Sequence, residues 1–142
     1  MIKYTSILQI LTVLLFMSCP VWAQTTKKKS LPVLSGTYEL VKMRNQNTLE
    51  AIEPGKTNID INTKTNQISA NVGCNSISGE FKTQKNKISP LKLMQTEMFC
   101  ADNKIETPFV QHLMRVNAYV LTSKQLSFCE GKKVLLVFEK KK

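Results

Sequence analysis

Short stretches in which apolar and polar residues alternate dominate the middle and the end of this chain. The clearest two are 57–62 and 67–72, and a short polar turn separates them. Because successive side chains of a strand point to opposite faces, this alternation predicts a β-hairpin with one buried face. Similar but shorter patterns predict further strands over 37–43, 76–81, 88–94, 117–122, 125–129 and 133–138.

The period changes over residues 102–116. Apolar residues there recur at intervals of four, four and three: Ile105, Phe109, Leu113 and Val116. This spacing forms one stripe of an amphipathic helix. Two starts for the helix remain open, a capping box of Asn103 with Glu106, or Thr107 as the cap with Pro108 in the first turn.

Strands followed by one helix and then by more strands predict an α+β fold. We expect a strongly curled, mostly antiparallel sheet of about seven or eight short strands that packs on the single α-helix as a half-open barrel. Residues 44–55 are polar and end in the turn signal Pro54-Gly55, so we interpret them as a long connection. A chain of 142 residues is long enough for one domain with a modest core.

The beginning of the chain has the pattern of an export signal. Lys3 precedes an apolar run over 7–16, which is too short for a permanent membrane helix. Val21 and Ala23 are small or compact residues at the two positions that a signal peptidase reads, so cleavage is expected before Gln24. The expected organisation is a signal peptide over 1–23, a basic flexible linker over 24–35, one domain over 36–139 and a basic tail over 140–142.

A second interpretation of the same region is lipidation. Residues 16–19 form a loose lipobox in which Cys19 would be acylated and become the first residue. Phe16 and Pro20 are unusual at their positions in such a motif, which favours simple cleavage. Both interpretations place the domain outside the cytoplasm, as a periplasmic or secreted protein or an outer-membrane lipoprotein, where thiols can oxidise.

The net charge of +10 lies mostly outside the expected domain. Seven of the twenty basic residues belong to the signal, the linker or the tail: Lys3, Lys27, Lys28, Lys29, Lys140, Lys141 and Lys142. The remaining thirteen face ten acidic residues, which leaves the domain at only +3. A nucleic-acid-binding protein would concentrate positive charge on one face of the fold, whereas most of the excess charge here lies outside the domain. We therefore expect no nucleic-acid partner. The basic ends allow a weak, salt-sensitive contact with a membrane surface.

One set of residues has a distinctive order and spacing: Gly73-Cys74-Asn75, Gly79, Phe81, Thr96-x-Met98-x-Cys100, Glu106, Phe109, Leu113 and Val116. Over about residues 36–139 this set resembles the META domain, or HslJ-like, family. The resemblance implies an exported protein, because members are typically exported and often lipoproteins, and the best-known member is linked to heat stress and novobiocin resistance. It implies no active site and no cofactor. Tyr38 stands where many members have Trp, and Cys129 is not part of the pattern.

Cys74 and Cys100 admit three interpretations. A disulfide suits an exported chain, and closing the 26 residues from 74 to 100 would stabilise the fold by about 3–3.5 kcal/mol. A metal site would need further ligands, whereas the chain has no Cys-x-x-Cys and a single histidine, His112. A Cys–His nucleophile is favoured only by the place of Cys100 before a helix. We therefore expect the disulfide, with neither a metal nor a catalytic residue.

Cys129 is the remaining cysteine of the domain. Leu126 and Phe128 alternate onto one face of their strand, so Cys129 is expected on the other face, half exposed. We interpret it as a small apolar residue and a free thiol.

The other motif residues have simple structural interpretations. Asn75 and Thr96 suit hydrogen bonds to nearby backbone in turns. The methionines of the region are expected to fill irregular space in the core rather than to line a ligand groove: Met94, Met98 and Met114.

These observations predict a non-catalytic, exported envelope module that serves stress tolerance or cell-surface integrity by binding or supporting an unknown envelope protein or small ligand. One alternative is a thiol-based redox sensor or enzyme that uses Cys74 and Cys100. Another is a carrier of a small lipophilic ligand. An apolar pocket left unfilled by Phe81, Phe99 and Phe109 would favour the carrier, and a filled core would exclude it.

Overall fold

The structure is a computed structural model, and it describes residues 33–99 and 104–141. Backbone contacts divide the chain into two compact units, residues 1–30 and 31–142, and all described residues belong to the second. The signal peptide over 1–23 and the lipid site at Cys19 lie outside the described residues and stay predictions. No helix within the described ranges is long and apolar enough to cross a membrane.

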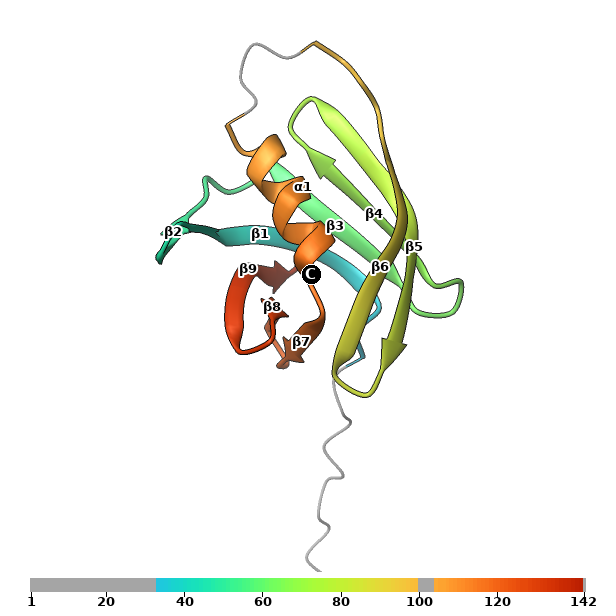
Figure 1. Ribbon diagram of the computed structural model, residues 1–142. Coiled ribbons are helices and arrows are strands. Elements are labelled where there is room, and N and C mark those ends of the chain that lie inside the picture. The colour runs from blue at the N-terminus through green and yellow to red at the C-terminus, as the bar shows by residue number, and fades with distance from the viewer. Residues whose placement is uncertain (1–32, 100–103, 142) are drawn as a thin grey trace, which may run out of the picture. The chain divides into compact units, whose positions relative to one another are not determined.

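The described residues form antiparallel strands and one α-helix, which confirms the α+β class (Figure 1). The elements are β1 (Gly36–Asn45), β2 (Thr48–Ala51), β3 (Thr57–Asn62), β4 (Gln67–Val72), β5 (Asn75–Gln84), β6 (Lys87–Gln95), α1 (Glu106–Arg115), β7 (Ala118–Leu121), β8 (Gln125–Glu130) and β9 (Lys133–Lys140). The nine strands form one sheet in the order β2-β1-β3-β4-β5-β6-β7-β8-β9, and β1 also pairs with β9. This last pairing makes the sheet ring-like.

The strand beyond the expected number is β2, which lies in the segment interpreted as a polar connection. It pairs with β1 from Asn45↔Thr48 to Lys42↔Ala51, and Gln46 adopts a positive φ of 47° in the tight turn between them. All four residues of β2 are exposed. Neither face of this strand is buried, so the short alternation of Leu49 and Ala51 with polar residues did not distinguish it from a polar connection.

The core fills the inside of the ring with large side chains. Five aromatic residues are at most 1% exposed: Tyr38, Phe81, Phe109, Phe128 and Phe138. Phe138 lies edge-on to Phe128 and to Phe109 of the helix, with ring centroids 5.4 and 6.3 Å apart. Phe109, Leu113 and Val116 of the expected helical stripe are buried, which attaches α1 to the sheet.

The helix begins later than its apolar stripe suggested. Ile105 is the N-cap and makes no side-chain capping bond, so the expectation of a Thr107 cap is wrong. Thr107 and Pro108 instead lie within the first turn, where a proline is tolerated because its missing N–H has no helical acceptor. The Glu106 carboxylate bonds side chains of the sheet, and Asn103 lies outside the described residues.

Register shifts in the sheet change the alternation of buried side chains, and two of them involve β9. The pairing of β1 with β9 changes register between Leu40 and Lys42, and the pairing of β8 with β9 changes between Phe128 and Cys129. A bulge of this kind turns the next side chain back to the same face. Cys129 is consequently buried, with 5% of its surface exposed, and the half-exposed position expected for it is wrong.

The strand pairing that forms the ring is least extensive between β6 and β7. Among the described residues, these strands share the single register pair Lys87↔Ala118, whereas β6 pairs with β5 along nearly its whole length. A backbone bond from the Ile88 N–H to the Asn117 carbonyl extends the junction slightly. Within residues 33–99 and 104–141, the remainder of β6 has no neighbouring strand on this side, and α1 lies beside it (Figure 1).

Candidate functional site

A polar cluster with a buried centre joins the start of β5, the end of β6 and the first turn of α1. Asn75 is its centre and is 3% exposed. The Asn75 Nδ2 group donates to the two Glu106 carboxylate oxygens, at 2.9 and 3.1 Å, and to the Met98 carbonyl at 3.2 Å. The Asn75 Oδ1 atom accepts bonds of 2.8 Å from the Thr96 hydroxyl and from the Met98 N–H. We call Asn75, Gln95, Thr96, Met98 and Glu106 the Asn75 cluster.

Glu106 is the charged member of this cluster and is 8% exposed. Gln95 donates its Nε2 hydrogen to Glu106 Oε1 at 2.5 Å, so amides from two strands hold the carboxylate. Burial of a carboxylate is costly without such hydrogen bonds. The position of Glu106 in the first turn of α1 adds a favourable interaction with the helix dipole.

Thr96 extends the contact between β5 and the segment after β6. Its hydroxyl accepts a bond from the Ser76 N–H, and its own N–H donates to the Ser76 carbonyl, both at 3.0 Å. The roles of Asn75 and Thr96 are thus structural, as expected, but their partners are not the local turns. The bonds of Asn75 and Thr96 join residues that are 20 or more positions apart in the sequence.

Two glycines of the motif meet different backbone requirements. Gly73 has a φ of 78° in the turn before β5, a conformation that costs little only for glycine. At Gly79, an added Cβ would lie 2.8 Å from the Leu93 side chain and 3.0 Å from the Lys92 carbonyl. Gly79 lies where the β5–β6 register shifts, as expected for a glycine inside a strand.

The cysteines lie in unlike surroundings. Cys74 is exposed and directly precedes Asn75, whereas Cys100 lies outside the described residues, so their pairing stays a prediction. Burial raises the pKa of the Cys129 thiol, which disfavours the reactive thiolate.

Few ionisable side chains converge in this structure. Within residues 33–99 and 104–141, no three His, Cys, Asp or Glu side chains gather as metal ligands. His112 is half-buried at the rim of α1, and its Nε2 atom lies 2.7 Å from the Arg44 carbonyl, to which it donates.

The expectation that the methionines of this region fill the core is wrong. Met94, Met98 and Met114 are 68%, 62% and 69% exposed, so they do not fill the core. Phe99 is also fully exposed. A groove of about 360 Å³ runs between β6 and α1 and is lined by Ile77, Pro90, Lys92, Leu93, Met94, Gln95, Val110 and Met114. The register shift between β5 and β6 places Leu93 against the core and leaves Met94 at the rim of the groove. A sequence pattern that assumes regular alternation along the strand does not predict this change of face.

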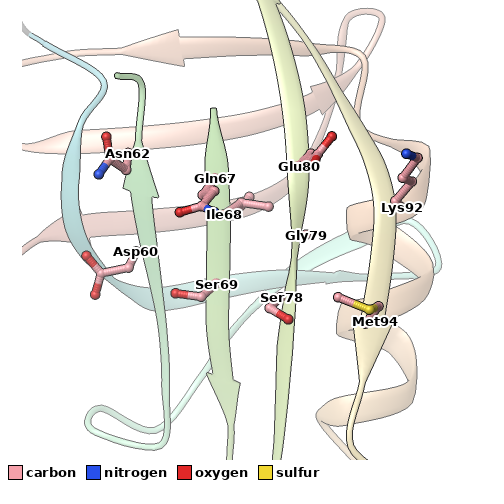
Figure 2. Close-up of a pocket in the computed structure, with 10 residues that line it drawn as sticks. All are labelled: Asp60, Asn62, Gln67, Ile68, Ser69, Ser78, Gly79, Glu80, Lys92 and Met94. Atoms are coloured by element: carbon pink, nitrogen blue, oxygen red, sulfur yellow. The ribbon is translucent and has the colours of Figure 1, made fainter. Parts of the chain in front are cut away.

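A second, more polar hollow lies on the outer face of β3, β4, β5 and β6 (Figure 2). Its volume is about 560 Å³, and short polar side chains such as Asn62, Ser69 and Ser78 project into it. Asp60 and Glu80 contribute negative charge. This hollow provides hydrogen-bonding groups at the surface, but its exposed side chains are those of an ordinary solvent-facing sheet.

The ring-like antiparallel sheet, the single helix and the buried Asn75–Glu106 contact between them define a small α+β domain. The META domain family model matches residues 31–142, and this chain belongs to the META domain family. A search for similar curated proteins finds no match.

Two solved structures have a similar fold. An NMR structure of a protein from Burkholderia xenovorans has a TM-score of 0.62 and 19% identity, over 75% of this chain and 82% of that chain. A crystal structure of a DUF4847 family protein from Bacteroides vulgatus has a TM-score of 0.54 and 16% identity, over 76% of this chain and 95% of that chain. At these identities the likeness concerns the fold alone.

Proposed function

We propose that this chain is a non-catalytic, exported module of the META type, which serves stress tolerance or cell-surface integrity by binding or supporting another envelope component. The observation that carries the proposal is the Asn75 cluster. Asn75 has two N–H donors and two acceptor lone pairs, and its bonds to Glu106, Thr96 and Met98 use this capacity within the fold. The polar residues of the family motif therefore hold elements together instead of presenting groups to a substrate.

We further propose that Cys74 and Cys100 form a disulfide beside this cluster. Cys74 adjoins Asn75, and the Asn75 side chain bonds the backbone of Met98, two positions before Cys100. The same two segments would then be joined by hydrogen bonds and by a covalent bond. Export would provide the oxidising surroundings that such a bond needs.

The two alternatives have less support. The redox alternative needs Cys74 or Cys100 as a reactive thiolate, and the disulfide proposed between them would leave neither thiol free. A carrier of a small lipophilic ligand would need an apolar cavity inside the fold. In the described residues, the Phe81 and Phe109 side chains are buried and occupy this interior space. Phe99 is exposed and encloses no interior space.

The experiment is intact mass spectrometry of the natively produced protein under non-reducing conditions, with a thiol count after unfolding. We expect loss of residues 1–23 or a lipid on Cys19, loss of two hydrogens for one disulfide, and one free thiol from Cys129. An intact N-terminus in a cytoplasmic fraction would refute export. Two additional free thiols in the exported protein would refute the disulfide and favour redox chemistry.

A further inference from the structure

Two large exposed apolar side chains, Met94 and Met114, line the groove between β6 and α1. Seven such side chains are exposed among the described residues, and four belong to β6, the segment after it or α1: Met94, Met98, Phe99 and Met114. The groove has an apolar lining that includes Leu93 and Val110. Exposed apolar patches mark interaction sites, and flexible methionines adapt to the shape of a partner.

One wall of this groove is an unpaired strand edge. In the described part of the chain, β6 pairs with β7 only through Lys87, although its other edge pairs with β5 as far as Gln95. The Thr96 N–H donates to the Ser76 carbonyl and so faces β5. Because the backbone groups of successive strand residues point to opposite edges, those of Gln95 face the groove.

The open edge is short and has defined limits. By the same alternation the backbone groups of Leu93 also face the groove, whereas Pro90 has no N–H to donate. Lys92 has a φ of 47°, which interrupts the regular strand between these two residues. Such interruptions prevent a sheet from adding strands without limit. A partner strand can therefore pair over only a few residues near Leu93 and Gln95.

We propose that this groove binds an extended segment of another polypeptide, which adds to β6 as a short strand and places alternate apolar side chains against Val110 and Met114. Lys92 lines the groove and forms no ion pair with the described residues, so an acidic residue in the segment is favoured beside it. Strand addition uses backbone bonds for affinity and side-chain pockets for specificity. The inference rests on the proposed binding function and specifies the partner class.

The first test selects binders from a phage library of random peptides of about eight residues, with the purified protein as bait. We expect selected peptides to alternate apolar residues and to carry an acidic residue. N-methylation of the amides that face β6 should weaken a synthesised binder about fivefold per lost hydrogen bond, whereas methylation of the intervening amides should not. Equal loss at both sets of positions, or no selected binder, would overturn strand addition.

Matched variants locate the site. Met114→Asp should weaken peptide binding at least about tenfold, because it places a charge on the apolar wall. Val120→Asp is the control, since Val120 is 58% exposed on β7 and does not line the groove. Lys92→Glu should weaken an acidic peptide about threefold and strengthen a peptide in which lysine replaces the acidic residue. Equal affinities of Met114→Asp and Val120→Asp would overturn the location.

Two further outcomes would assign the groove differently and overturn the inference. One is Met114-dependent binding to vesicles of phosphatidylglycerol and phosphatidylcholine without peptide binding. The other is a Met114-dependent dimer in light scattering, also without peptide binding. An exported protein with one free thiol and no peptide affinity would refute this inference alone. A cytoplasmic protein that binds such peptides would refute only the proposed export.

Discussion

Replacement of Asn75 by alanine tests whether the Asn75 cluster stabilises the fold. The substitution removes the Nδ2 group that donates to the Glu106 carboxylate and to the Met98 carbonyl, and the Oδ1 acceptor for the Met98 N–H and the Thr96 hydroxyl. Gln95 continues to donate to Glu106, and water can reach Met98 and Thr96, so the loss is smaller than the number of bonds suggests. A buried polar group left without its partner costs about 1–3 kcal/mol, and we expect a total of about 2–4 kcal/mol.

The measurement is urea unfolding followed by far-ultraviolet circular dichroism, with the oxidation state of the cysteines held constant. For a domain of this size the expected loss corresponds to a melting temperature lower by about 10–20 °C. Asn71→Ala is the matched control, because Asn71 is exposed on the neighbouring β4, and its effect should stay within about 0.5 kcal/mol. A double-mutant cycle with Glu106→Ala should show a coupling energy of at least about 1 kcal/mol. If Asn75→Ala and Asn71→Ala unfold at the same urea concentration, the structural role of the cluster is refuted.

The nearly isosteric variant Asn75→Asp adds a dependence on pH. Its new carboxylate would lie about as far from the Glu106 carboxylate as the present 2.9 Å contact. Two like charges at this distance raise the pKa of one carboxyl in the folded state above its unfolded value. The folded variant then binds more protons than the unfolded chain, so its stability deficit should shrink as the pH falls from 7.5 to 5. A deficit that grows over this range would contradict the assigned contact.

Three further substitutions or modifications test other parts of the structure. Gly79→Ala should destabilise by about 1–3 kcal/mol, because its Cβ would lie 2.8 Å from the Leu93 side chain, and exposed Ser78→Ala is the control in urea unfolding. Cys74→Ser should lower the free energy of unfolding by about 3 kcal/mol if the disulfide is present, and a reducing agent should then affect only the parent protein. Alkylation of Cys129 in the folded protein should begin at a higher pH than for an exposed thiol, because burial raises its pKa, and unfolding should remove the difference; equal rates in both states would contradict its burial.

Regular elements with one buried face are predictable from this sequence. The bounds expected for β3 and β4 agree with the structure, because Ile59, Ile61 and Ile68 alternate without interruption. The helical stripe also identifies the buried side of α1. In these elements the apolar residues themselves mark the buried face, so the element can be predicted without knowing which strands lie beside it.

The remaining features depend on pairings between distant segments. Cys129 and Met94 lie after register shifts, and such shifts arise from the fit between two strands rather than from either strand alone. Glu106 was identified as a motif residue, but its bonds to Asn75 and Gln95 form only when α1 reaches the sheet. The groove could not be predicted for the same reason, because β6 and α1 contribute its two walls.

The pairing of β1 with β9 has a consequence for how this protein folds during its synthesis. The first and last strands of the ring lie side by side, with Tyr38 opposite Lys140 and Leu40 opposite Phe138. A ribosome must therefore release almost the entire domain before the closing pair can form, and contacts so distant along a chain form slowly. This late closure would delay completion of the fold during synthesis, which would suit the export proposed above.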